Sequence, residues 1–102
     1  MNFNEYQKLA RSTAIYPEEY KVIYPALGLC GEAGEVAEKV KKNIRDGKSL
    51  DGVGLELGDV LWYVAALADD LGVTLDQVAN WNVDKLQRRM KWKNIKGDGD
   101  NR

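Results

Sequence analysis

The sequence contains no histidine, and this absence removes several of the commonest catalytic arrangements. Without an imidazole the chain cannot build a Ser-His-Asp or Cys-His nucleophile, or a zinc site with histidine ligands. Cysteine is almost as scarce, because Cys30 is the single one and has no internal disulfide partner. We expect it to be a core thiol in a reducing compartment. Any general base must therefore be a carboxylate or depend on a metal ion.

Long apolar runs and an excess of one charge are also lacking. The formal net charge is −1, from 15 basic and 16 acidic residues that are mixed along the chain. A broad surface for a nucleic-acid polymer or a membrane is therefore not expected. No apolar run approaches membrane-spanning length, and the N-terminus lacks the charged and apolar blocks of a signal peptide. At 102 residues we expect one helical domain over residues 1–96, a flexible tail over 97–102, and a cytoplasmic location.

The apolar periodicity and the turn residues predict four helices and almost nothing that resembles a strand. Asp46-Gly47 predicts the end of the second helix, Asp51 is expected to cap the third, and Thr74 opens the fourth. Residues 18–24 are ambiguous and give at most one loose turn. The expected helices cover residues 4–14, 25–45, 52–71 and 74–92.

Two acidic pairs of identical spacing, Glu32/Glu35 and Glu56/Asp59, lie in the second and third predicted helices. Residues three apart lie one turn apart on the same face of a helix. The first acid of each pair borders an apolar stripe, where an unpaired carboxylate is costly to desolvate. The stripe of the second helix consists of Leu29, Cys30, Val36, Ala37, Val40 and Ile44, and that of the third consists of Val53, Leu57, Val60, Val64, Leu67 and Leu71. Four carboxylates in one small volume repel each other unless a cation lies among them. The pattern predicts a divalent-metal site; the alternative is a set of ion pairs with Lys or Arg across the helices.

The two acidic motifs also carry a resemblance to a known family. They read G-E-A-G-E-V-A-E at residues 31–38 and E-L-G-D at 56–59, and a weaker motif, N-x-x-K-L-x-x-R, covers 82–89. With them the chain resembles the MazG-like, all-α nucleoside triphosphate pyrophosphohydrolases. The resemblance implies a four-helix all-α fold completed by association into a homodimer or homotetramer. It also implies Mg²⁺, for which Mn²⁺ can substitute.

The activity that the resemblance implies is hydrolysis of nucleoside triphosphates, with deoxynucleoside triphosphates favoured, to the monophosphate and pyrophosphate. Glu32, Glu35, Glu56 and Asp59 then become the metal ligands. Glu35 and Glu38 are the candidate catalytic bases, although Glu38 lies beside basic residues and fits a solvated position equally well. The residues expected to bind the substrate are Tyr63 and Asn82 for the nucleoside, and Lys85 and Arg89 for the phosphates.

Other basic residues and other functions remain open at this point. Lys39, Lys42 and Arg88 fit phosphate contacts and ordinary solvated charge equally well. A carboxylate-bridged di-iron bundle usually needs Glu-x-x-His pairs, which this sequence lacks. The main alternative is a non-catalytic helical module for interaction or oligomerisation, in which the acids form structural ion pairs. That alternative predicts no metal requirement.

Overall fold

The computed structural model describes residues 1–96, and all of its regular structure is helical. The predicted all-α fold is therefore confirmed, whereas the predicted flexible tail lies outside the described residues. A short 3₁₀ turn precedes the second α-helix. In chain order the elements are α1 (Phe3–Ser12), η1 (Glu18–Tyr20), α2 (Ile23–Asp46), α3 (Val53–Asp70) and α4 (Leu75–Lys96).

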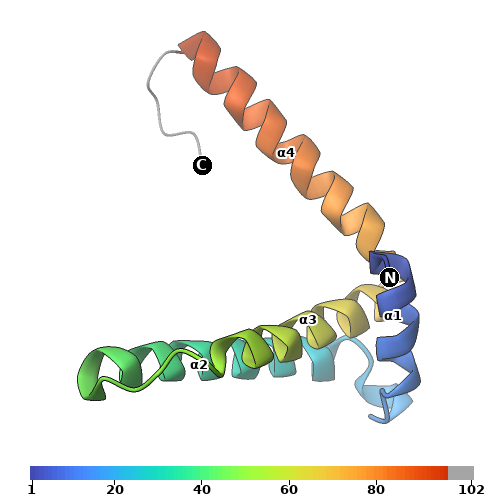
Figure 1. The fold of residues 1–102 in the computed structure, drawn as a ribbon. Helices are drawn as coiled ribbons and strands as arrows, with labels where there is room; N and C mark the ends of the chain where they lie inside the picture. Colours follow the sequence, from blue (N-terminus) through green and yellow to red (C-terminus); the bar gives the residue numbers. More distant parts are fainter. Residues whose placement is uncertain (97–102) are drawn as a thin grey trace.

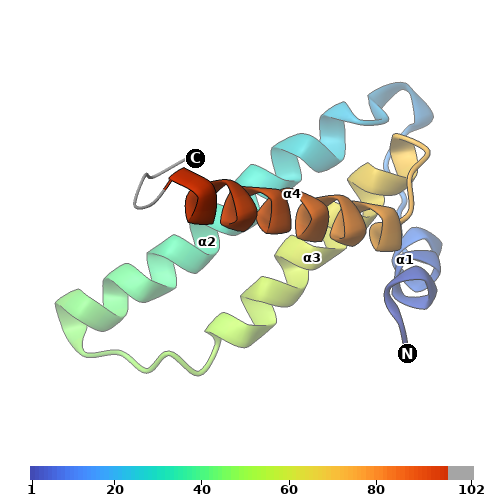
Figure 2. The same cartoon turned by 90° about the horizontal axis from the view of Figure 1, so that it is seen from above.

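The long helices α2 and α3 lie side by side as an antiparallel hairpin, and α1 packs across the end of α3 (Figures 1 and 2). Helix α4 contacts α1 and α3 near its own start and then projects away from the hairpin (Figure 1). None of the helices within residues 1–96 combines the length and the apolar character needed to cross a bilayer.

Local signals explain most of the helix ends. The Asn2 side chain accepts a hydrogen bond from the backbone N–H of Glu5, whose carboxylate accepts one in return. Gly47 ends α2 in the left-handed conformation, with φ of 68°. Thr74 and Gln77 bond each other reciprocally at the start of α4, as expected for a capping box.

The predicted cap of α3 is wrong. Gly52, not Asp51, is the N-cap residue, and no side chain caps this helix. The N–H of Asp51 donates to the Ser49 hydroxyl at 3.0 Å, and the N–H of Val53 donates to the carbonyl of Leu50. Asp51 therefore belongs to the turn before the helix, one residue too early to reach the first free amides.

The core of the single chain is small and lies where α1, α3 and the start of α4 meet. Its buried apolar residues are Ala10, Ala65, Ala68 and Leu75. A buried amide, Gln7, crosses this junction: its Nε2 donates to the carbonyls of Ala65 and Val73, and its Oε1 accepts from the N–H of Leu75. One polar side chain thus ties three segments together.

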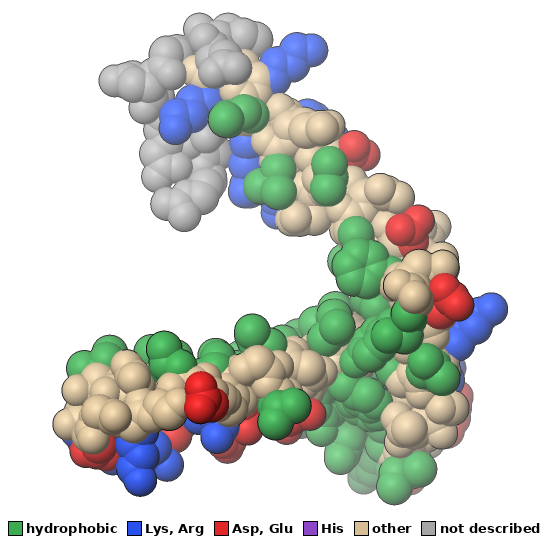
Figure 3. Space-filling model, in the orientation of Figure 1, with side chains coloured by type: hydrophobic (Ala, Val, Ile, Leu, Met, Phe, Trp, Pro, Cys, Tyr) green, Lys and Arg blue, Asp and Glu red, His purple; other side chains and the backbone are tan. Residues whose placement is uncertain are grey.

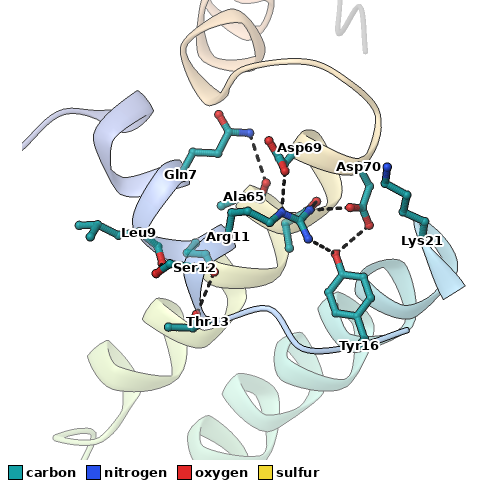
Figure 4. Close-up of polar contacts among 12 residues, drawn as sticks. Gln7, Leu9, Arg11, Ser12, Thr13, Tyr16, Lys21, Ala65, Asp69 and Asp70 are labelled. Atoms are coloured by element: carbon teal, nitrogen blue, oxygen red, sulfur yellow. Dashed lines mark hydrogen bonds and ion pairs between the residues drawn. The ribbon is translucent and has the colours of Figure 1, made fainter. Parts of the chain in front are cut away.

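A second polar network fixes the start of α2 (Figure 4). The carboxylate of Asp70 is fully buried and bonds Arg11 at 2.5 Å, the Tyr16 hydroxyl at 2.8 Å and the N–H of Val22 at 2.9 Å. Val22 has a φ of 68° and a ψ of −51°, and the next N–H donates to the carbonyl of Lys21 at 2.7 Å. This is a γ-turn of the rare and strained kind, at a β-branched residue. The turn lets α2 begin at Ile23, two residues before the predicted start.

Many of the apolar residues of α2, α3 and α4 remain on the surface, and one expectation is wrong. Cys30, expected to be a core thiol, is exposed. The predicted apolar stripes are only partly covered: Ile44 is 79% exposed and Leu57 54% exposed. Apolar side chains gather on the side of the hairpin that faces the projecting α4 (Figure 3). The sequence encodes more apolar surface than one chain buries.

Candidate metal and nucleotide site

Three carboxylates converge between α2 and α3. Glu32 from α2 meets Glu56 and Asp59 from α3, and one oxygen from each lies within 4.8 Å of the other two. The spacing of three on α3 places Glu56 and Asp59 on one face, and packing against α2 brings Glu32 to them. The predicted gathering of acids across two helices is therefore present, as a group of three.

Glu35 does not belong to this group. It is exposed on α2 one turn after Glu32, near enough for its charge to act on the Glu32 carboxyl. Three residues along an α-helix rotate the side-chain direction by about 60° from alignment. On α3, Glu56 and Asp59 both border α2 in spite of this rotation. On α2, the same rotation leaves the Glu35 side chain exposed to solvent.

The cluster carries unbalanced negative charge. Partial burial raises the pKa of the Glu32 carboxyl, and the charges of Asp59, Glu56 and Glu35 raise it further. The ammonium of Lys39 lies 3.8 Å from Glu56, so the alternative of ion pairing is met at one of the three acids. Neither Glu32 nor Asp59 forms an ion pair within residues 1–96. Three converging carboxylates in this state suit a hard divalent cation, which takes oxygen ligands.

Aromatic side chains form a wall beside the cluster. A pocket of about 370 Å³ is lined by Glu32, Asp59, Trp62 and Tyr63. The Trp62 and Tyr63 rings meet edge to face with centroids 4.9 Å apart, and the indole N–H donates to Thr13 at 2.7 Å. This wall has flat apolar faces for a planar ligand, immediately beside the acids.

Gly28 is what allows Tyr63 to take its place against α2. A Cβ atom at Gly28 would lie 2.2 Å from the tyrosine ring, so any larger residue would displace it. The rings of Tyr24 and Tyr63 form a tilted pair with centroids 6.5 Å apart. Tyr24 in turn stacks on Tyr16, with ring centroids 4.9 Å apart. The structure thus places Tyr63, one of the two residues expected to contact the nucleoside, in the aromatic pocket beside the acids.

The remaining predicted residues are not brought to the cluster within one chain. Glu38 pairs with Lys41 at 3.1 Å and with Lys42 at 3.9 Å. Asn82 and Lys85 are exposed and Arg89 is half-buried on α4, which diverges from the hairpin (Figure 1).

Trp62 is the pocket residue that the sequence pattern does not single out. Its position three residues after Asp59 is the available signal, because that spacing places it on the acidic side of α3. The pattern favours its neighbour Tyr63, which lies closer to the apolar stripe. Both line the pocket.

Comparison with known proteins identifies the family. A family model described as the MazG nucleotide pyrophosphohydrolase domain matches residues 25–93. The chain belongs to the MazG family. The matched region of this MazG domain contains the acidic cluster, both aromatic wall residues and most of α4. The chain is also similar to the Gene 37 protein of Mycobacterium phage L5, with 45% identity over 114 aligned positions that cover 100% of both chains. No solved structure matches it.

Proposed function

We propose that this protein hydrolyses nucleoside triphosphates, deoxynucleoside triphosphates in particular, to the monophosphate and pyrophosphate in a magnesium-dependent reaction. The observation that carries the proposal is the cluster of Glu32, Glu56 and Asp59 beside an aromatic pocket, in a chain of the MazG family. The carboxylates that would hold a metal ion thus lie next to aromatic rings that would stack on a base, as binding of a metal-bound nucleotide requires. We expect the reaction in the cytoplasm.

Glu32, Glu56 and Asp59 are the residues that would hold magnesium, or manganese in its place. The fit rests on the donor set, because Mg²⁺ prefers a few carboxylates together with substrate phosphates. The ion would offset the charge of the triphosphate and polarise its phosphoryl oxygens. Glu32 would experience less repulsion from its neighbours in the loaded site.

The side chains around the cluster suggest roles in the reaction. Glu35, exposed and one turn from Glu32, is suited to orient the attacking water and accept its proton, since the chain has no histidine. The water oxygen forms a new bond to phosphorus while the anhydride between the α- and β-phosphates breaks, and pyrophosphate leaves. Glu38 is the second candidate base. Tyr63 and Trp62 would hold the nucleoside.

The first test is analysis of the phosphorus-containing products from a panel of ribo- and deoxyribonucleoside triphosphates, with magnesium and with chelator. We expect monophosphate and pyrophosphate, formed with magnesium alone, and a ranking of bases and sugars. Release of inorganic phosphate would contradict the proposed bond cleavage. Absence of turnover by folded protein across the panel would favour the non-catalytic interaction module.

We also infer that a second copy covers the exposed apolar surfaces. An apolar groove of about 280 Å³ runs between α2, α3 and the start of α4. On α4 itself Trp81 is 54%, Leu86 51% and Met90 61% exposed. The accessible surface of the chain is 7587 Å², against roughly 5800 Å² for a compact monomer of this mass. The difference exceeds the roughly 800 Å² that each partner buries in a standard interface.

Association should be visible in solution. Light scattering coupled to size exclusion is expected to give two or four times the chain mass of 11.5 kDa. Leu86→Glu should shift the protein toward monomer, because a charge buried in the interface costs several kcal/mol. Ile15→Glu is the matched control, since Ile15 is 95% exposed, follows α1 and does not line the apolar groove. A wild-type monomer at high concentration would contradict the inference.

A further inference from the structure

A second cavity, separate from the aromatic pocket, lies at the turn between α2 and α3. We call it the turn pocket; its volume is about 410 Å³, and its lining residues are Lys39, Lys42, Arg45, Asp46, Lys48, Ser49 and Gly52. Four of these side chains are basic and one is acidic. A cavity of this size falls in the range of small-ligand sites.

The positive charge of the turn pocket is only partly neutralised. Asp46 pairs with Arg45 at 2.7 Å, and Lys42 lies 3.9 Å from Glu38. Lys48 forms no ion pair in the part of the chain that the structure describes. The lining residues alone carry a net charge of +3. The pocket therefore suits a compact ligand with several negative charges.

The N-terminus of α3 adds to this field. Gly52 is the N-cap residue and offers no side chain to the first amides of an 18-residue helix. The partial positive charge at a helix N-terminus and its free N–H groups favour anions. The missing side chain also makes room for Lys39, whose ammonium would lie 3.2 Å from a Cβ atom at Gly52. Cationic side chains and helix dipole thus act in the same place.

Lys39 connects the turn pocket to the acidic cluster. Its ammonium lies 3.8 Å from Glu56 while its side chain lines the turn pocket. Lys39 is seven residues, or two turns, after Glu32, which corresponds to about 10 Å along the helix. A linear ligand can therefore pass from the acids to the basic residues along one side of the hairpin.

We propose that the turn pocket binds the terminal phosphates of the triphosphate substrate and the pyrophosphate released from it. This inference rests on the proposed function. The polyphosphate chain is the part of such a substrate that carries several charges, whereas base and sugar carry none. The ion pair between Lys39 and Glu56 is long, at 3.8 Å. The Lys39 ammonium can therefore move from this carboxylate to the phosphates when Glu56 serves as a metal ligand.

The test is direct binding of inorganic pyrophosphate to the full-length protein by isothermal titration calorimetry, in about 0.15 M salt to screen unspecific attraction. The double variant Lys42→Gln/Lys48→Gln should weaken pyrophosphate binding at least tenfold, with magnesium and with chelator. Lys41→Gln is the matched control: it removes one charge next to Lys42 from a side chain that pairs with Glu38 outside the turn pocket. It should change the affinity less than twofold.

The outcomes separate this inference from the proposed function. Pyrophosphate that binds the double variant as tightly as the wild type would overturn the turn-pocket site, even if the enzyme turns over triphosphates normally. Equal weakening of binding by Lys41→Gln would overturn it too, since general charge would then explain the effect. A third outcome is that no triphosphate is hydrolysed, while pyrophosphate binds the wild type and binds the double variant more weakly. This result would overturn the proposed reaction and keep the anion site. Nucleoside monophosphate affinity should be unchanged in the double variant.

Discussion

Replacing Glu32 by glutamine should lower magnesium-dependent hydrolysis at least 100-fold and leave the metal-free protein no less stable. The loss of activity follows from removal of a carboxylate that would hold the ion, because even residues that only support metal ligands contribute tenfold to 100-fold. The unchanged or improved stability follows from the burial and the repulsion that raise the pKa of Glu32. A raised folded-state pKa means that the ionised form costs stability at neutral pH, and the neutral amide removes that cost.

The two effects of Glu32→Gln are measured separately. Product formation gives the activity, and urea unfolding in chelator and in magnesium gives the stability. Magnesium should stabilise the wild type, as any ligand of the folded state does, and should have little effect on the variant. Glu19→Gln, an exposed acid on η1, is the control and should keep both the activity and the magnesium effect. Wild-type activity in Glu32→Gln would exclude the acidic cluster as the metal site.

Helix positions were largely predictable because their signals are local. Gly47 and the Thr74–Gln77 pair act within a few residues, and both ends lie where the sequence indicated. The start of α2 was not predictable, because the γ-turn at Val22 depends on Asp70, 48 residues away. A short-range pattern contains no information about such a contact. The path of α4 was equally hidden, because its apolar residues do not specify whether they pack within the chain.

The candidate site shows the same division between local and distant information. The spacing of Glu56 and Asp59 on α3 predicted that they share one face of the helix. The acidic pair of the same spacing on α2 suggested that Glu32 would lie close to them, as it does. The exposure of Glu35 depends on how α2 is rotated against α3, which periodicity does not give to within one residue. The position of the Lys39 side chain could not be predicted from the sequence, because it depends on the space left by Gly52 in the following turn.

The buried carboxylate of Asp70 has the largest expected effect on stability. Asp70→Ala should lower the free energy of unfolding by about 3 kcal/mol, as expected when one partner of a buried ion pair is removed. Arg11 would lose its buried partner, although it keeps contacts with Asp69 and with a backbone carbonyl of α3. The N–H of Val22 would lose its acceptor at 2.9 Å, so the strained turn that begins α2 would lose its restraint.

The measurement is urea unfolding of wild type and Asp70→Ala at one protein concentration, at neutral pH and near pH 3. Burial alone would raise the pKa of Asp70, but hydrogen bonds from Val22, Tyr16 and Arg11 outweigh it and lower that pKa. A lowered folded-state pKa supplies stability above the ordinary value of about 4, and this stability is lost as the pH falls through the folded value. The difference between wild type and Asp70→Ala should therefore narrow in acid. Asp69→Asn, at the exposed partner of Arg11, is the control and should cost under about 1 kcal/mol at either pH. Equal costs for the two aspartates would show that burial of Asp70 adds nothing to the pairing, and that the start of α2 is held by its packing on α3 instead.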